Sequence, residues 1–281
     1  MLKTRVLTAV ILIPLVLAAM FGLGTRVWGA ITLAIVVVGA SEWANVAGLH
    51  KNASLLFVAG TMLIGAVLLF LIPAGFAPGQ AWPEALVLLV CGSATIFWLF
   101  VAPLWLYSRW PVESKLVLAL VGWLLLLATW VAVVEMRAQS PGLLLAMMAI
   151  VWIADTAAYF AGRRFGRRKL APSISPGKTW EGVCGAMLAV CIYAAILLLF
   201  AHDLGYTRKL SLGFAAAWVA TLLLLTALSV VGDLFESQLK RQRGIKDSGT
   251  ILPGHGGVLD RIDALTAAMP AAALVSHYVI R

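Results

Sequence analysis

Long apolar runs separated by short polar segments dominate this chain. Nine of them approach the roughly 20 residues that a helix needs to cross a bilayer. They lie near residues 6–23, 27–48, 53–75, 85–107, 116–134, 142–162, 183–201, 211–231 and 262–280. The first lacks a small-x-small cleavage site and another run follows at once, so we expect a retained helix rather than a signal peptide. The pattern predicts an all-α, polytopic integral membrane protein of about nine transmembrane helices.

Composition agrees with a membrane protein. Of the 281 residues, 62% are hydrophobic and 12% are charged, whereas soluble domains carry about 25% charged residues. The net charge of +9 is typical of loops that face anionic lipid, and no soluble basic domain exists to bind nucleic acid. Cys91, Cys184 and Cys191 lie in apolar runs without metal-binding spacing, so we expect small buried hydrophobic residues.

The basic residues divide unevenly between the two sides that nine spans define. Sixteen of the 21 Lys and Arg residues fall on the side of the N-terminus, which favours an N-terminus in the cytoplasm and a C-terminus outside. The two long charged loops, 163–182 and 232–261, fall on that cytoplasmic side. We therefore expect residues 1–140 to form a scaffold of helices and residues 141–281 to carry an active site in a cytoplasm-facing polar cavity.

The stretch 237–263 concentrates charge. It holds five cations and three carboxylates, namely Lys240, Arg241, Arg243, Lys246, Arg261, Asp247, Asp260 and Asp263. Hydrocarbon disfavours such a cluster, so it must lie at the membrane surface or in a wet cavity. Basic groups hold phosphates, glycines permit close backbone approach and carboxylates hold a divalent metal. These are the parts of a phosphoryl-transfer site.

The carboxylates of this stretch are metal-ligand candidates. Asp260 and Asp263 are three residues apart at the start of the last helix, so we expect them on one face, kept ionised by the helix dipole. Helix capping with a salt bridge to Arg261 is the alternative. Asp247 is a third candidate, or part of a solvated turn. Asp233 and Glu236 are either ligands of a second metal or a solvated helix face.

Other residues are candidates for binding anions. His255, with Gly256 and Gly257, lies in a loop whose backbone N–H groups suit an anion. Ser175 to Thr179 is similar to the tail of a P-loop, but Pro172 stands where glycine is required and no strand is predicted before it, so we reject that fold. Lys178 remains a phosphate-binding candidate, with hydroxyl donors at Ser175 and Thr179.

Two acidic residues lie within apolar runs. Asp155 is a functional-site candidate because ionisable groups in membrane helices are usually functional; pairing with a cation such as Arg163 is the alternative. The cations from Arg163 to Lys169 either bind anionic head groups or only set the topology. Glu42 lies near the end of the second span, where we expect an interfacial residue rather than a site.

Several of these segments together resemble one family. The chain contains Ser237-x-Leu239-Lys240-Arg241, Lys246-Asp247, Leu252-Pro253-x-His255-Gly256-Gly257 and Asp260-Arg261-Ile262-Asp263. This long pattern resembles the signature of phosphatidate cytidylyltransferases, the CDP-diacylglycerol synthases. The segments 155–159, 165–172 and 175–181 are also similar to bacterial members, with Ala157 and Arg168 departing from the usual residues. The resemblance is strong over about 150–270.

The resemblance implies a reaction of CTP with phosphatidic acid that yields CDP-diacylglycerol and pyrophosphate and requires Mg²⁺, with a second cation left open. Its setting would be the bacterial inner membrane, among membrane lipids; a homodimer is also left open. The implied roles follow the motif. Asp247, Asp260 and Asp263 would hold the metal, and Lys246 and Asp155 would complete the catalytic set. Lys178 and Arg163 would bind phosphatidic acid, and Lys240, Arg241, Lys246 and Arg261 would hold the phosphates of CTP or the leaving pyrophosphate. Ser175, Thr179, Ser237, His255, Gly256 and Gly257 are further substrate-binding candidates.

Three other classes of protein fit parts of the pattern. A secondary transporter or channel would explain nine spans and Asp155, but not the charge packed into two loops on one side, and no internal repeat is visible. A CDP-alcohol phosphotransferase carries an Asp-Gly…Ala-Arg pattern that this chain lacks. A lipid kinase or undecaprenyl-type enzyme that uses a nucleotide remains as the third alternative.

Overall fold

The computed structural model describes residues 2–72, 81–111, 113–200, 211–251, 254 and 256–279, and most of these residues are helical. The helices are α1 (Leu2–Gly22), α2 (Thr25–Val46), α3 (Lys51–Leu71), α4 (Glu84–Ile96), the π-helix η1 (Phe97–Val101), α5 (Ala102–Ser108), α6 (Lys115–Gln139), α7 (Pro141–Phe165), α8 (Trp180–Leu199), α9 (Leu212–Gln242) and α10 (Leu259–Val279). Two short strands, β1 (Lys169–Ala171) and β2 (Ser175–Thr179), pair antiparallel.

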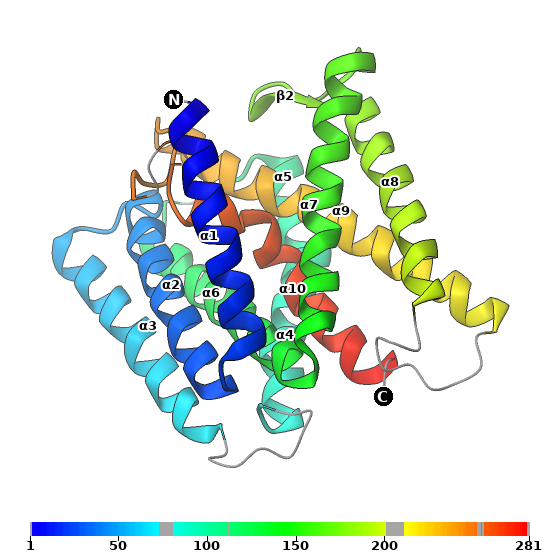
Figure 1. Cartoon of the computed structure of the whole chain (residues 1–281). Coiled ribbons are helices and arrows are strands. Elements are labelled where there is room, and N and C mark those ends of the chain that lie inside the picture. The colour runs from blue at the N-terminus through cyan, green and yellow to red at the C-terminus, as the bar shows by residue number, and fades with distance from the viewer. Residues whose placement is uncertain are drawn as a thin grey trace.

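The helical spans follow the predicted apolar runs. Seven helical segments of the described chain are long and apolar enough to cross a membrane: α2, α3, the continuous segment Glu84–Ser108, α6, α7, α8 and α9. The other two predicted spans correspond to α1 and α10. The two ends of the described chain lie at opposite ends of the bundle (Figure 1), and the count of nine crossings stays a prediction because α1 and α10 are not among these seven. The all-α membrane fold is therefore confirmed, with the small hairpin as an addition.

The fourth span contains a local irregularity. Its helix passes through the π-turn η1 between α4 and α5, and Pro103 lies at the start of α5. Proline has no N–H to donate and its ring clashes with the carbonyl four residues earlier, so the regular α-helical ladder cannot continue through it. The π-turn absorbs this defect without ending the helix.

Helix α10 lies at the centre of the bundle. It packs against α9, α6, α4, α7 and α2, and Figure 1 shows it surrounded by the other helices. Its buried residues include a series of alanines, at Ala264, Ala267, Ala268 and 271–273. Small side chains allow backbones to approach closely in membrane bundles, so this composition suits a central position.

The outer faces of the bundle are apolar. Leu56 and Phe70 on α3, and Leu188 and Ile192 on α8, are exposed, as expected for side chains that meet lipid. The prediction of three buried cysteines is therefore wrong for Cys184, which is exposed on α8, and for Cys191, which is only half-buried there, whereas Cys91 is buried. In a membrane protein an apolar neighbourhood in the sequence does not indicate burial, because both faces of a helix can be apolar.

The long charged loop predicted over 232–261 is partly helical. Helix α9 has 31 residues and runs to Gln242, about three turns beyond the predicted end of its span at residue 231. Its last turns therefore carry Asp233, Glu236, Ser237, Lys240 and Arg241 on a rigid helix. The loop itself begins after Gln242 and ends where α10 starts at Leu259.

Candidate active site

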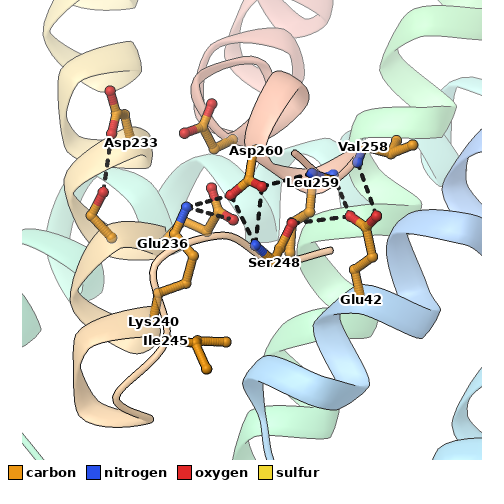
Figure 2. A network of polar contacts seen from close by, with 12 residues as sticks. Glu42, Asp233, Glu236, Lys240, Ile245, Ser248, Val258, Leu259 and Asp260 are labelled. Atoms are coloured by element: carbon orange, nitrogen blue, oxygen red, sulfur yellow. Dashed lines mark hydrogen bonds and ion pairs between the residues drawn. The ribbon is translucent and has the colours of Figure 1, made fainter. Parts of the chain in front are cut away.

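The end of α9 presents charged side chains on successive turns. Asp233, Glu236, Ser237 and Lys240 are spaced three or four residues apart, so they share one helix face. Glu236 is 3% exposed and Lys240 is 7% exposed, which excludes a solvated face for Glu236. Lys240 Nζ lies 3.3 Å from Glu236 Oε1 and 2.5 Å from Asp260 Oδ1. The buried ammonium therefore joins α9 to the start of α10 (Figure 2).

Asp260, in the first turn of α10, organises the loop before it. Its Oδ2 accepts hydrogen bonds from the backbone N–H groups of Ser248 (3.0 Å) and Gly257 (2.8 Å). The Ser248 N–H also lies 3.2 Å from Oδ1. The alternative of a helix cap with a salt bridge to Arg261 differs from this arrangement, because the two donors precede α10 and Asp260 forms an ion pair with Lys240. The carboxylate closes the loop onto the end of α9.

Asp263 lies one turn further along α10 in a different setting. It is half-buried and within electrostatic reach of Asp233 and Glu236 on α9. Its Oδ1 accepts a hydrogen bond from the N–H of Ala264 at 2.7 Å, and its side chain is also within hydrogen-bonding reach of Glu236. Both Asp260 and Asp263 lie within electrostatic reach of Glu236, while Asp260 also accepts from the loop, and their expected joint role at a metal stays a prediction.

The second charged segment reaches this cluster through the hairpin. Lys178 in β2 forms an ion pair with Asp233, with Nζ 2.6 Å from Oδ2. Asp233 Oδ1 also accepts a hydrogen bond from the Ser237 hydroxyl at 3.3 Å. Asp155 on α7 is within electrostatic reach of both Asp233 and Lys178. Lys178 thus lies between carboxylates from α7 and α9.

Arg241 ties the hairpin to α9 at a second point. Its Nε donates to the carbonyl of Ile174 at 3.3 Å, and its Nη1 donates to the carbonyl of Ile245 at 3.2 Å. The contact with Ile174 holds the two charged segments together at the end of the bundle where α1 begins (Figure 1), and the contact with Ile245 holds Arg241 against the start of its own loop. The prediction that these segments lie on one side and meet is confirmed.

Other predicted residues lie at the edge of the cluster. Lys246, Asp247 and Arg261 are exposed; Asp247 is near Asp260, because the two flank Gly256. Thr179 is buried and caps α8 by accepting from the N–H of Gly182 at 3.1 Å. These residues surround the cluster rather than forming its centre.

Two more predicted residues, Ser175 and Arg163, form no ion pair within the described part of the chain. Ser175 is half-buried at the start of β2. Arg163 is exposed and donates to the Tyr159 hydroxyl at 3.1 Å, which differs from the suggested pairing with Asp155. His255 lies outside the described residues.

Sequence reasoning missed the role of Glu42 on α2. It was expected at the membrane interface, but it is 2% exposed and accepts hydrogen bonds from Ser248, Val258 and Leu259. The available signal was an acidic residue within an otherwise apolar run. Hydropathy cannot show which distant segment such a residue meets, because the contact spans 206 positions of the sequence.

A divalent metal fits part of this arrangement. Among the described residues no group of three or more His, Cys, Asp or Glu side chains has the geometry of a complete metal site. However, buried Glu236 is only partly satisfied in the described chain: its Oε1 has the ion pair with Lys240 at 3.3 Å, its Oε2 accepts no hydrogen bond from a described donor, and Asp263 is its neighbour. Mg²⁺ typically takes one or two protein carboxylates and completes its shell with water and substrate phosphates. Glu236 and Asp263 are suited to supply the two protein carboxylates of such a site.

Taken together, the fold and the site define a class. A bundle of membrane-spanning helices carries, at one end, a cluster of carboxylates and cations suited to phosphate groups and a divalent metal. This is the arrangement of a membrane-embedded enzyme that acts on phosphorylated substrates. Sequence comparison gives the family: the profile of the "Cytidylyltransferase family" matches residues 3–279, and the chain belongs to that family.

Individual relatives agree over nearly the whole chain. The chain is 40% identical over 279 residues to a phosphatidate cytidylyltransferase of Pseudomonas aeruginosa, which covers 96% of this chain and 95% of that protein. It is 39% identical over 287 residues to the protein of the same name from Haemophilus influenzae, covering 96% of each. A phosphatidate cytidylyltransferase of Thermotoga maritima is 42% identical over 131 residues, which is 47% of each chain.

Proposed function

We propose that this protein transfers the cytidylyl group of CTP to phosphatidic acid, forming CDP-diacylglycerol and pyrophosphate. Family membership and the relatives of that name in Pseudomonas aeruginosa and Haemophilus influenzae support this reaction. The observation that carries it in the structure is the junction of the two charged segments, where Lys178 meets Asp233 and Lys240 meets Asp260. The segment that carries Lys178 suits a lipid phosphate, and the segment from the end of α9 to the start of α10 suits a nucleotide triphosphate.

The proposed reaction is an in-line displacement. A phosphate oxygen of phosphatidic acid bonds to the α-phosphorus of CTP, the bond from that phosphorus to the bridging β-phosphate oxygen breaks, and pyrophosphate leaves. A phosphate monoester at neutral pH is already anionic, so no strong general base is required. The protein must instead bring two anions together, which it does by positioning and by charge neutralisation.

Lys178 is suited to the phosphatidic acid head group. It is half-buried on β2, at the surface end of α7, whose outer side is apolar with Tyr159 and Phe160 exposed. A lipid phosphate approaching along this side would exchange the ion pair with Asp233 for one with the substrate. Asp155, Ser175, Thr179 and Arg163 surround this position on α7 and the hairpin.

The CTP side is assigned to the α9–α10 loop. The exposed cations Lys246, Arg241 and Arg261 would bind the triphosphate and the leaving pyrophosphate, together with His255 and the glycines of the loop. Buried Lys240 is already paired with Asp260 and Glu236, so we assign it to holding the site together, with Ser237 beside it.

Glu236 and Asp263 would hold Mg²⁺. Asp247 and Asp260 would lie nearer the triphosphate. A second cation would bind beside Asp233. When bound, the metal would neutralise phosphate charge as the two anions meet. This assignment narrows the set read from the sequence, because the oxygens of Asp260 already accept from Lys240 and two backbone amides.

The proposed location is the inner membrane of a bacterium, with the site facing the cytoplasm, where CTP is available. The excess of basic residues on that side supports this orientation. Dimerisation of the bundle stays a proposal without an assigned interface.

The decisive experiment uses purified protein with phosphatidic acid, Mg²⁺ and CTP labelled in the base. We expect label in the lipid product and one pyrophosphate released per lipid labelled. Transfer of label only from the γ-phosphate of CTP would identify a kinase instead. The absence of lipid labelling and of pyrophosphate release would contradict the proposal and favour a transporter.

A further inference from the structure

Glu42 occupies an unexpected place in this molecule. It lies near the end of α2, in the half of the chain expected to serve as a scaffold, yet its carboxylate points into the loop between α9 and α10 (Figure 2). Its Oε2 accepts from the N–H of Leu259 at 2.7 Å and from the Ser248 hydroxyl at 3.1 Å. Its Oε1 accepts from the N–H of Val258 at 3.0 Å.

These contacts join the interior of the loop to its end. Ser248 lies inside the loop that begins after Gln242, and Val258 and Leu259 lie where the loop meets α10. Asp260 bridges nearly the same two points, because it accepts from the N–H groups of Ser248 and Gly257. Two carboxylates from different helices therefore close the loop, one from α2 and one from α10.

The backbone of the loop lies directly on the Glu42 carboxylate. A Cβ placed at Gly249 would be 2.5 Å from Glu42 Oε1, and one placed at Gly257 would be 2.5 Å from Glu42 Oε2. Any larger residue at either position would push the carboxylate away. The absence of a side chain at both positions is what allows the loop to close over Glu42.

A second contact fixes the same end of α2. Arg243, just after α9, donates from Nε to the carbonyl of Val46 at 3.2 Å and from Nη2 to the carbonyl of Ala47 at 2.6 Å. The end of α2 is thus held against both ends of the α9–α10 connection. A buried carboxylate is costly unless it is hydrogen-bonded. The oxygens of the Glu42 carboxylate accept their hydrogen bonds from residues of the loop and from the first residue of α10.

We propose that Glu42 is a positioning residue for nucleotide binding. By closing the α9–α10 loop it holds Asp260, Gly256 and Gly257 and the neighbouring Asp247 in one arrangement toward the triphosphate. It touches no substrate itself. The proposal rests on the proposed cytidylyl transfer, because that reaction assigns this loop to CTP and the Lys178 side to phosphatidic acid.

The test is the variant Glu42→Gln, assayed as full-length purified protein after size-exclusion chromatography. The amide keeps the shape of the side chain but presents a donor to backbone N–H groups, so part of the closure is lost. We expect the KM for CTP to rise and kcat/KM for CTP to fall roughly 10- to 100-fold, the range typical for residues that orient binding groups. The KM for phosphatidic acid should change less than about twofold, because the ion-pair partner of Lys178 is Asp233 on α9 rather than a residue of this loop.

A matched control separates positioning from general stability. Glu135 on α6 is also a buried carboxylate, 0% exposed, and it accepts from the N–H groups of Ala81 and Trp82 at 2.9 and 3.2 Å. Glu135 lies near the C-terminal end of α6, where neighbouring Arg137 contacts Thr25 at the start of α2. Glu42 lies near the other end of α2. Glu135→Gln should lower thermal stability but leave both KM values unchanged.

A second variant attacks the same contact from the loop. Gly249→Ala places a methyl group against Glu42 Oε1 and should raise the KM for CTP in the same selective way, which keeps the test available if Glu42→Gln does not fold. Hydrogen exchange of peptides covering 248–259 should be faster than wild type in both variants.

Four outcomes would overturn the proposal. They are an unchanged KM for CTP with unchanged exchange, an equal rise in both KM values, the same selective change in Glu135→Gln, and Gly249→Ala with wild-type kinetics. If wild-type protein itself fails to transfer label from CTP to lipid, the proposed function fails instead, so the two failures are distinguishable.

Discussion

At the residue scale, the site depends on how carboxylates and lysines are paired. Lys240 is bound between Glu236 and Asp260, and Lys178 is bound to Asp233. Among the described contacts, Asp263 forms no close ion pair with Lys240 or Lys178, although it lies beside Glu236 and Asp233. A concentration of like charge needs a cation to stabilise it, so Asp263 is the residue at which the metal assignment is most directly tested.

The variant Asp263→Asn removes one charge and keeps the shape of the side chain. We expect the protein to insert and fold, but cytidylyl transfer to fall about 100-fold or more at every Mg²⁺ concentration, because a metal ligand is lost. The measurement is a Mg²⁺ titration of lipid labelling with purified protein.

Glu113→Gln, which removes an exposed carboxylate between α5 and α6, is the control and should keep wild-type turnover. Normal turnover of Asp263→Asn would show that this residue does not hold the metal.

Lys178→Ala tests the lipid side of the site. Without the ammonium, the KM for phosphatidic acid should rise at least about tenfold, the range expected for a charge-assisted contact to phosphate, and it should rise more than the KM for CTP. Steady-state kinetics with each substrate varied in turn measures both values.

Lys169→Ala, on the paired strand of the same hairpin and exposed, should change neither KM substantially. A larger rise in the KM for CTP than for phosphatidic acid in Lys178→Ala would exchange the two assigned positions.

At the scale of elements, α10 combines two tasks. Its first turn carries Asp260 and Asp263, and the rest of the helix is an alanine-rich segment at the centre of the bundle. The small side chains let α9, α6 and α4 pack closely around it. The position of the site therefore depends on helix packing below it, since α9 and α10 each supply part of the charged cluster.

Ala268→Leu tests this packing. Ala268 is fully buried, and overpacking of a filled core costs about 1–3 kcal/mol, so we expect a lower thermal midpoint in detergent by scanning fluorimetry. Ala216→Leu on the exposed face of α9 adds the same atoms toward lipid and should leave the midpoint unchanged. Equal midpoints for the two variants would indicate that α10 is not tightly packed.

At the scale of the whole molecule, the two charged segments meet at one end of the bundle. The hairpin and the end of α9 are joined there by Arg241 and by the Lys178–Asp233 pair, while the two ends of the described chain lie at opposite ends (Figure 1). The distribution of Lys and Arg then predicts which end faces the cytoplasm.

Reporter fusions test this orientation. Alkaline phosphatase fused after Arg281 should be active, because it folds only outside the cytoplasm, and a fluorescent protein fused at the same place after Sec-dependent export should be dark. Fusions within the α9–α10 loop region, after Arg243, should show the opposite pattern. Active phosphatase in that loop would place the candidate site on the outer face.

The sequence by itself determined the membrane fold, the helical spans and the two segments that carry charge. Hydropathy is a local property, and a segment crossing hydrocarbon must satisfy its backbone internally, so spans can be located without tertiary contacts. For the motif residues from Ser237 to Asp263 the sequence also predicts a phosphate- and metal-binding role, which stays a prediction. Helix ends were less certain, and α9 proved three turns longer than its apolar run.

Only the tertiary structure decided how these residues are distributed. Asp260 and Asp263 look alike in sequence, but the first closes a loop and the second lies beside the α9 carboxylates. Glu42 had no neighbour in sequence to indicate its role, because its partners lie more than 200 positions away. Charged residues far apart in the sequence become paired only when their helices pack together. The small residues that allow close packing do not indicate which helices will be in contact.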